Sequence, residues 1–275
     1  MGRRNIFIPL GELKRLYIDD GLTSLDLAKK LNCSDATIRN KLHKLGVKLQ
    51  PGGRRKFKYK KFPFNGSGTE KAYMFGFRVG DLNVYRPNPK SKILVVRCHT
   101  TILDQVDVIK HLFGKYGMVR ISESKNNSYH VNCYLDLSFE FLIKKIFIPQ
   151  WAKNNKTNSL AFIAGYTDAE GSFRLNQGKG RFKIDSYDYF VLSWMYNFLQ
   201  RFNINVKFRR ISKKGESYGK GNWNNDLWRL NINDANSLEK FINLISPFLL
   251  HRGRIKDAKM VLKNIKQRRK NGTIR

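Results

Sequence analysis

Two apolar segments, placed 89 residues apart, constrain the fold of this chain more than any other feature. Residues 73–81 read Tyr-Met-Phe-Gly-Phe-Arg-Val-Gly-Asp, and residues 162–171 read Phe-Ile-Ala-Gly-Tyr-Thr-Asp-Ala-Glu-Gly. Each segment carries two small residues four positions apart on one helical face, Gly76 with Gly80 and Gly165 with Ala169. Glycine inside a helix costs about 1 kcal/mol relative to alanine, so its use here predicts close approach of two helix backbones. Such packing places the two helix C-termini side by side.

Acidic residues end both segments, Asp81 in the first and Glu170 in the second. A carboxylate at a helix C-terminus meets the negative end of the helix dipole, and two neighbouring carboxylates repel each other. A divalent cation would remove both penalties, and carboxylates with main-chain carbonyls are ligands that suit Mg²⁺. We therefore expect a metal site at these two acids. The alternative is that the acids only cap the helices structurally.

The same order of elements follows each segment. In the first half we expect helices over 72–81, 102–116 and 139–145, and strands over 83–85, 93–98, 119–122 and 129–137. In the second half we expect helices over 160–170, 189–202 and 237–246, and strands over 173–176, 181–184, 206–211 and 227–232. The prediction is an α+β fold of two tandem αββαββα repeats, residues 69–150 and 151–275, related by a pseudo-two-fold axis as in a duplicated dimer.

Net charge, apolar runs and cysteine spacing limit the classes of binding partner and of cellular compartment that suit this chain. Lysine and arginine number 53 against 21 acids, a net charge of +32, while 41% of residues are hydrophobic. A folded protein with this field favours a polyanion. No apolar run approaches the roughly 18 residues of a membrane span, and no signal-peptide core follows the basic start. The three scattered cysteines indicate neither a zinc site nor a disulfide framework. We expect an intracellular protein without a membrane partner, cytoplasmic or nucleoid-associated, with an organelle also open.

Residues 1–49 predict a small all-α helix-turn-helix module. Its apolar positions follow helical spacing: Leu13, Leu16, Tyr17, Leu25, Leu27, Ala28, Leu31, Ile38, Leu42 and Leu45. Ser34 suits an N-cap and Gly46 a helix C-terminus, which together bound a second, recognition-type helix. The residues of that helix expected to contact DNA are Thr37, Arg39, Asn40 and His43. The alternative is a generic three-helix packing unit with a solvated polar face.

Basic segments lie on both sides of the repeats. Residues 50–68 form a linker rich in lysine, arginine and aromatic side chains, and we expect Arg54 and Arg55 to lie along a phosphate backbone. The alternative is a solvated flexible tether, and both descriptions are compatible. Residues 263–275 predict either a further phosphate-contacting helix or a disordered tail.

The two segments with their acids resemble the LAGLIDADG homing endonucleases of the single-chain, two-motif kind. Residues 163–171 match the motif closely, with Glu170 in the acid position, and residues 74–82 match more loosely because Leu82 replaces the final glycine. The resemblance implies a monomeric internal pseudo-dimer that cleaves double-stranded DNA. It also implies that Asp81 and Glu170, with the carbonyls of the preceding Gly80 and Ala169, hold Mg²⁺, or Mn²⁺, between two scissile phosphates.

The resemblance further implies a glutamine at the end of the second strand of each repeat, with a lysine nearby. The corresponding positions here are His99 and Asp185, and neither is followed by lysine. We take both as catalytic candidates, with His99 orienting water or accepting a proton. An ordinary surface histidine is the alternative. Basic residues that would replace the lysine are Lys144, Arg252 and Arg254.

Alternation along the strands predicts a DNA-binding face on each sheet. One side of each strand is apolar, and the other side carries basic and amide residues with almost no acids. Such side chains bind phosphates or base edges. The expected contacts are Tyr85, Lys92, Arg97 and Arg120 in the first repeat, and Arg174, Asn176, Arg181, Lys183, Lys207, Arg209, Arg229 and Asn231 in the second.

Together these features predict a site-specific DNA endonuclease of the intron- or mobile-element-homing type, with an added helix-turn-helix. Two other functions are compatible with the same basic surfaces. One is a non-cleaving DNA-binding regulator that kept the fold, and the other is an RNA-binding maturase that assists intron splicing. Retention of both acids favours the enzyme.

Overall fold

The structure, a computed structural model, describes residues 9–18, 22–49, 60–124, 126–144, 147–219 and 221–274. The chain divides into two compact units, Met1–Tyr59 and Lys60–Arg275, which are described separately. None of the helices in these described ranges combines the length and the apolarity that crossing a bilayer requires.

The first unit consists of three short helices around a small core. They are α1 (Leu10–Ile18), α2 (Ser24–Lys30) and α3 (Asp35–Lys44). The Ser34 side chain accepts a hydrogen bond from the Thr37 amide and caps α3, and Gly46 follows the helix with a φ of +67°. The core consists of Leu13, Leu16, Leu27, Ala28, Ile38, Leu42 and Val47. Leu25 is 59% exposed, so its expected place on the buried face is wrong, because the turn of α2 directs it to solvent.

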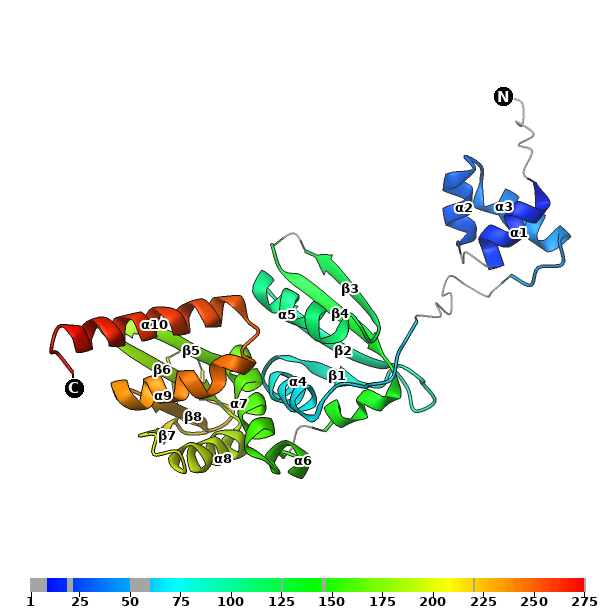
Figure 1. Cartoon of the computed structure of the whole chain (residues 1–275). Coiled ribbons are helices and arrows are strands. Elements are labelled where there is room, and N and C mark those ends of the chain that lie inside the picture. Colours follow the sequence, from blue (N-terminus) through cyan, green and yellow to red (C-terminus); the bar gives the residue numbers. More distant parts are fainter. Residues whose placement is uncertain are drawn as a thin grey trace. The chain divides into compact units, whose positions relative to one another are not determined.

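The first repeat of the second unit has the predicted order of elements (Figure 1). It consists of α4 (Gly68–Asp81), β1 (Asn83–Tyr85), β2 (Leu94–Thr100), α5 (Leu103–Phe113), β3 (Met118–Glu123), β4 (Tyr129–Leu135) and the 3₁₀ helix η1 (Leu137–Leu142). The strands form an antiparallel sheet in the order β1-β2-β4-β3, called sheet 1 below.

The second repeat follows with the same topology. After the short α6 (Gln150–Lys153) come α7 (Lys156–Glu170), β5 (Gly171–Asn176), β6 (Lys179–Ser186), α8 (Tyr189–Gln200), β7 (Lys207–Ser212), β8 (Leu227–Ile232), α9 (Ala235–Ile245), the 3₁₀ helix η2 (Ser246–Phe248) and α10 (Arg252–Lys270). Its antiparallel sheet, sheet 2, has the order β5-β6-β8-β7. The predicted fold class, two tandem αββαββα repeats with an α+β architecture, is confirmed.

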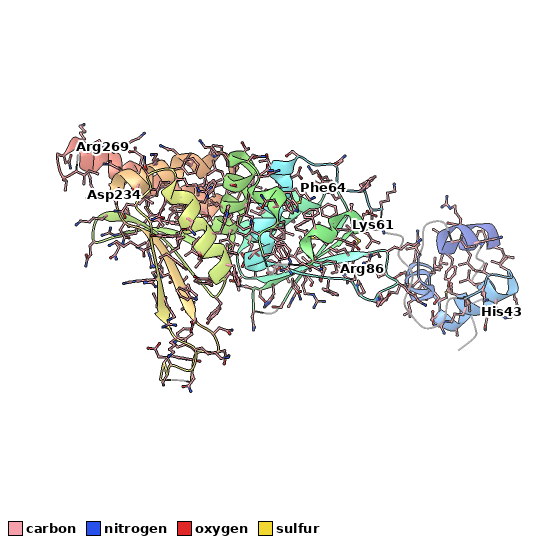
Figure 2. All side chains as sticks on the ribbon, turned by 90° about the horizontal axis from the view of Figure 1, so that it is seen from below. His43, Lys61, Phe64, Arg86, Asp234 and Arg269 are labelled. Carbon is pink, nitrogen blue, oxygen red and sulfur yellow. The ribbon has the colours of Figure 1, made fainter. Side chains whose placement is uncertain are left out.

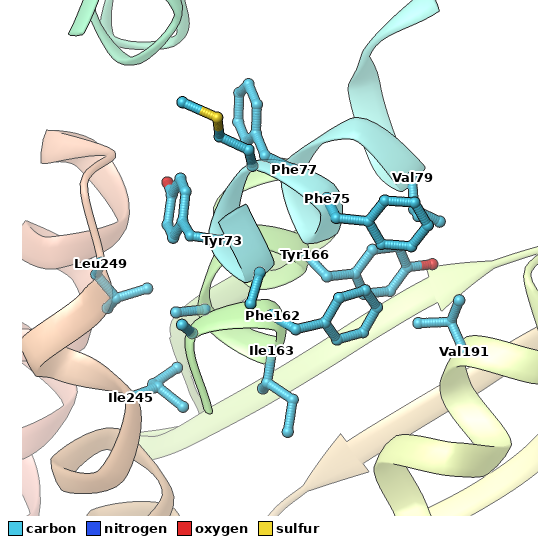
Figure 3. Packing of buried hydrophobic residues seen from close by; sticks show 14 of the residues in the cluster. Tyr73, Phe75, Phe77, Val79, Phe162, Ile163, Tyr166, Val191, Ile245 and Leu249 are labelled. Carbon is cyan, nitrogen blue, oxygen red and sulfur yellow. The ribbon is translucent and has the colours of Figure 1, made fainter. Parts of the chain in front are cut away.

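The two repeats meet at α4 and α7, whose backbones are as close as the glycines predict. A Cβ on Gly76 would lie 2.1 Å from the Phe162 carbonyl oxygen, and one on Gly165 would lie 2.2 Å from the Tyr73 carbonyl oxygen. No side chain fits into either space. Aromatic side chains of both helices, among them Phe75, Phe77 and Tyr166, pack around this contact (Figure 3). Gly76 and Gly165 therefore each allow the backbone of the opposite helix to come close.

The basic segments on both sides of the repeats are ordered against the second unit where they are described. The Phe62 amide donates a hydrogen bond to the Tyr116 carbonyl. The ring of Phe64, which is labelled in Figure 2, packs edge-on against Phe139. Described residues of 263–275 continue α10, which packs on β5 and β6 with Ile265 fully buried. A disordered tail is therefore the wrong alternative for this helix, because its apolar face covers sheet 2.

Candidate functional site

The C-termini of α4 and α7 bring the two motif acids together. Asp81 is the last residue of α4 and Glu170 is the last residue of α7. A Cβ on Gly80 would lie 2.5 Å from the Ala169 Cβ and 3.5 Å from Glu170 Oε1. The two acids are therefore neighbours because small residues precede them on helices that touch.

Electrostatics at Asp81 reflect this crowding. Burial, followed by the charge of Glu170, raises the pKa of Asp81 to about 7. The charge of Arg254 and a hydrogen bond from the Gln105 side chain, 2.5 Å from Nε2 to Asp81 Oδ2, oppose that rise. A second carboxylate beside a half-buried one is costly in the absence of a counter-charge.

The donor atoms fit a hard divalent cation. Two carboxylates are present, and the last carbonyls of a helix, here those of Gly80 and Ala169, have no partner within the helix. Oxygen ligands of this kind suit Mg²⁺ or Mn²⁺. Across the described ranges there is no group of three or more His, Cys, Asp or Glu side chains placed to hold a metal, so a cation at this site would depend on these carboxylates and carbonyls.

Two polar residues behind the acids were not anticipated from the sequence. Gln105 is buried near the start of α5 and contacts Asp81 directly. Asp168 is 1% exposed and accepts hydrogen bonds from the Tyr73 hydroxyl at 2.6 Å and from the amides of Leu250 and His251. Burial raises the pKa of Asp168 to about 6 despite these donors. The one sequence clue to Gln105 is an amide among the apolar positions of its helix.

The basic residues suggested as replacements for the lysine differ in their surroundings. Arg254, in the first turn of α10, acts electrostatically on both Asp81 and Asp168. Arg252 is mostly exposed and pairs with Asp107 at 3.7 Å. Lys144 is exposed after η1. Arg254 is therefore the candidate whose charge acts at the motif acids.

The outward face of sheet 2 is densely basic. Its outward-facing strand residues include Arg174, Asn176, Lys179, Arg181, Lys183, Asp185, Lys207, Arg209, Arg229 and Asn231. Most of these side chains line a hollow of about 410 Å³ on this face. All eight contacts expected in the second repeat therefore lie on one face of one sheet, although Asn231 is 8% exposed.

The outward face of sheet 1 is far less charged. Its outward-facing strand residues are Asn83, Tyr85, Val95, Arg97, His99, Met118, Arg120, Ser122, His130, Asn132 and Tyr134. Arg97 is held in place by hydrogen bonds to Asn132 and to the Tyr85 hydroxyl. Lys92 is exposed just before β2, and its carbonyl accepts a hydrogen bond from Lys61. Three of the four contacts expected in this repeat thus share the sheet face.

The two positions expected for glutamine face a partner on the neighbouring strand. His99 lies opposite His130, and the two rings stack with centroids 4.3 Å apart. Asp185 lies opposite Arg229, whose guanidinium donates two hydrogen bonds to it at 2.6 and 2.7 Å. Lys183 Nζ donates a third at 2.6 Å. Partial burial alone raises the pKa of Asp185, but hydrogen bonds from Arg229 and Lys183 outweigh burial and keep the pKa below its usual value.

The residues expected to contact DNA in the first unit lie along α3. Arg39, Asn40 and His43 are exposed and Thr37 is partly exposed. Arg39 Nε pairs with Asp35 at 3.0 Å one turn earlier, which steadies its side chain. Arg54 and Arg55 lie outside the described residues.

Comparison with known families agrees with this architecture. Residues 157–246 match the model of the LAGLIDADG-like domain. The second repeat is therefore similar to a LAGLIDADG-like domain. The match spans α7 apart from its first residue, the four strands of sheet 2, α8 and all of α9, and so includes Glu170. No curated protein matches the sequence of this chain.

Several solved structures are similar to this chain at low sequence identity. A mesophilic variant of the homing endonuclease I-DmoI is 16% identical with a TM-score of 0.47, covering 65% of this chain and 95% of that one. The homing endonuclease I-WcaI, bound to its DNA recognition sequence, is 13% identical with a TM-score of 0.46, covering 77% and 96%. Full-length DUF199/WhiA from Thermatoga maritima is 17% identical with a TM-score of 0.45, covering 75% and 62%.

Proposed function

We propose that this chain is a site-specific endonuclease that hydrolyses phosphodiester bonds of double-stranded DNA with Mg²⁺ or Mn²⁺, acting as a monomer with an internal pseudo-dimer. The observation that carries the proposal is the pair of acids, Asp81 and Glu170, held side by side at the C-termini of two touching helices. The polybasic outward face of sheet 2 supports it, since a strongly positive surface favours a polyanion, and a cation at the two carboxylates would offset their negative charge.

The acids and the last helix carbonyls are the groups that would hold the cation. When bound there, a divalent cation stabilises the negative charge that develops on the phosphate during hydrolysis. Asp81 and Glu170 supply its carboxylate ligands, and the Gly80 and Ala169 carbonyls lie at the same helix ends. Gln105 fixes the orientation of the Asp81 carboxylate by its hydrogen bond to Oδ2. His99 is exposed at the end of β2, where it is available to a water or a phosphate.

The sheets would provide the binding surface for the duplex. On sheet 2 the outward-facing cations and amides are of the kinds that contact phosphates and base edges, and on sheet 1 Tyr85, Arg97 and Arg120 have the same roles. We propose that α3 of the first unit makes additional contacts through Thr37, Arg39, Asn40 and His43, so that it extends the target or regulates expression. Homing of an intron or other mobile element is the biological role that such an enzyme would serve.

The decisive experiment is metal-dependent cleavage of DNA that flanks the insertion site of the gene itself. In Mg²⁺ the wild-type chain should cut both strands, and Asp81→Asn or Glu170→Gln should reduce the rate on the order of 10³-fold, because several kcal/mol of charge stabilisation is lost. Glu239→Gln is the matched control, since Glu239 pairs with Arg269 on the helix side of sheet 2. Cleavage by both acid variants at the wild-type rate would refute the mechanism.

One observation favours the non-cleaving regulator as a second candidate. Asp185 occupies a position where the resemblance implies glutamine, and three hydrogen bonds from cations occupy its carboxylate. Tight, site-specific duplex binding with no nicking in Mg²⁺ or Mn²⁺ would support that function. Competition between duplex DNA and structured RNA at one fixed salt concentration separates both candidates from an RNA maturase, for which the RNA should win.

A further inference from the structure

An imidazole pair occupies the outward face of sheet 1. His99 on β2 and His130 on β4 are directly opposite each other in the strand register, and both are exposed. Their rings are stacked, with an interplanar angle of 15° and centroids 4.3 Å apart. Ser122 on β3 lies opposite His130 on the other side. The strand pairing, rather than a flexible loop, therefore fixes the two imidazoles beside each other.

The groups that face this pair are neutral or cationic. The neighbouring outward-facing residues with charged or titratable side chains are Arg97 on β2, Arg120 on β3, Tyr134 on β4 and Tyr85 on β1. The one acid in the four strands is Glu123, which is opposite Tyr129 and thus alternates to the other side of the sheet. No carboxylate among the strand residues of this face can balance a proton on either imidazole.

The equivalent position in the second repeat shows the contrast. There the cross-strand pair is Asp185 and Arg229, which neutralise each other through two hydrogen bonds. In the first repeat both members of the pair are of the type that gains a positive charge between pH 5 and 8. The strand residues of this face supply no anion for such a pair, and the face is the one proposed for the duplex.

We propose that His99 and His130 form a phosphodiester-binding site that takes up a proton from solvent when DNA binds to sheet 1. In the bound state one imidazolium N–H donates a hydrogen bond to a phosphate oxygen, while the second ring stays neutral and stacks on it. Arg97, already ordered by Asn132 and Tyr85, adds a permanent positive charge beside them. This inference rests on the proposed function, since it takes duplex DNA as the polyanion.

The experiment measures affinity for a labelled mixed-sequence DNA duplex in EDTA between about pH 5 and 8, at constant salt. If binding takes up one proton, the affinity falls as pH rises, by up to about tenfold for each pH unit within the usual range of an imidazole. Calorimetry in two buffers of different ionisation enthalpy counts the protons directly. Because the pKa of Asp81 is raised to about 7, both chains carry Asp81→Asn in this experiment, and we expect more proton uptake by the chain that retains both histidines than by the chain with His99→Gln/His130→Gln, whose amides still donate hydrogen bonds.

Controls separate this site from two of the three remaining histidines and from the proposed function. His111→Gln changes an exposed histidine of α5 and should leave the pH dependence unchanged, and His43→Gln reports any contribution of α3. Circular dichroism at both ends of the pH range verifies folding. Binding with proton uptake undiminished by the two histidine substitutions, or with none in the chain that retains both histidines, overturns this inference and leaves the endonuclease proposal standing. Absence of duplex binding at every pH overturns both.

Discussion

The two repeats share a backbone plan but carry different chemistry at matching positions. At the ends of their second strands, the first repeat has two stacked imidazoles and the second has an aspartate bound by an arginine and a lysine. The outward face of sheet 2 is dense with cations, whereas sheet 1 presents two arginines among aromatic, amide and histidine side chains. By contrast, the helices α4 and α7 match each other at Gly76 and Gly165, each of which lies against the backbone of the opposite helix.

This difference shows at which positions the two halves of a duplicated fold can acquire different residues. The helix contact is buried and reciprocal, so a larger residue on either side displaces the backbone of the other. The outward sheet faces contact solvent or ligand, so each half can acquire its own recognition chemistry without a cost in packing. A pseudo-symmetric protein of this kind is suited to an asymmetric target, with one half dominated by permanent charge and the other by groups that titrate.

The largest effect tests where the repeats are alike. Gly76→Ala and Gly165→Ala should each lower the free energy of unfolding of the second unit by about 3 kcal/mol, because the new Cβ would meet a backbone carbonyl oxygen about 2 Å away. Urea unfolding measures both. Gly68→Ala is the control, since its Cβ would lie 3.3 Å from the Asn158 side chain, and it should cost less than about 1 kcal/mol. A large loss of unfolding free energy in only one of the two variants would contradict the reciprocal packing of the two helices.

A smaller effect separates the two acids whose pKa values move in opposite directions. The folded-state pKa of Asp81 is raised to about 7, so the folded chain binds a proton that the unfolded chain has lost, and stability falls as pH rises from about 4 to 7. In EDTA at pH 8, Asp81→Asn should therefore be more stable than the wild type by on the order of 2 kcal/mol, with the gain vanishing below the usual aspartate range.

Asp185 should behave in the opposite way. Its folded-state pKa is lowered, so its stabilisation is present above the usual aspartate pKa and is lost as pH falls through the lowered value. Asp185→Asn should cost about 1 kcal/mol at neutral pH and little in strong acid. Thermal melts across pH measure both variants. Equal and same-signed changes for the two acids would contradict the contrast drawn here.

The smallest effect concerns binding by sheet 2. Asp185→Asn releases Arg229 and Lys183 from their ion pairs, so duplex affinity in EDTA at low salt should rise by roughly tenfold. The slope of log K against log salt should steepen by up to about 2, since each cation that contacts a phosphate contributes about 0.9. Asp226→Asn is the matched control, because it frees Arg210 near the end of the β7–β8 hairpin. An unchanged slope would mean that Asp185 does not restrain these cations.

Much of the architecture follows from local patterns in the chain. Alternation predicted every strand of both sheets to within a few residues, and Ser34 and Gly46 mark the ends of α3 as expected. Local patterns do not decide which surfaces tertiary contacts cover. Leu25 obeys helical spacing yet is exposed, and of the two alternatives for the basic C-terminal segment the structure shows the helix, which packs on sheet 2.

The candidate site divides in the same way. Asp81 and Glu170 were identified from the sequence because they end two glycine-bearing helices, whereas Gln105 and Asp168 were not, because their importance comes from partners distant in the chain. Likewise His99 was a candidate on its own position, but nothing in the sequence indicates that His130 stacks on it. That contact depends on the register of β2 against β4.

The sequence by itself determined that two helices approach closely, that two acids end them, and that a strongly cationic chain repeats one αββαββα plan. Glycine spacing, helix-end chemistry and strand alternation are local properties, so they can be read without a structure. Only the tertiary structure decided which side chains oppose each other across strands and between repeats. Those pairings depend on register and on the α4–α7 contact, and they make one half of a symmetric fold an ion-paired surface and the other a stacked pair of imidazoles.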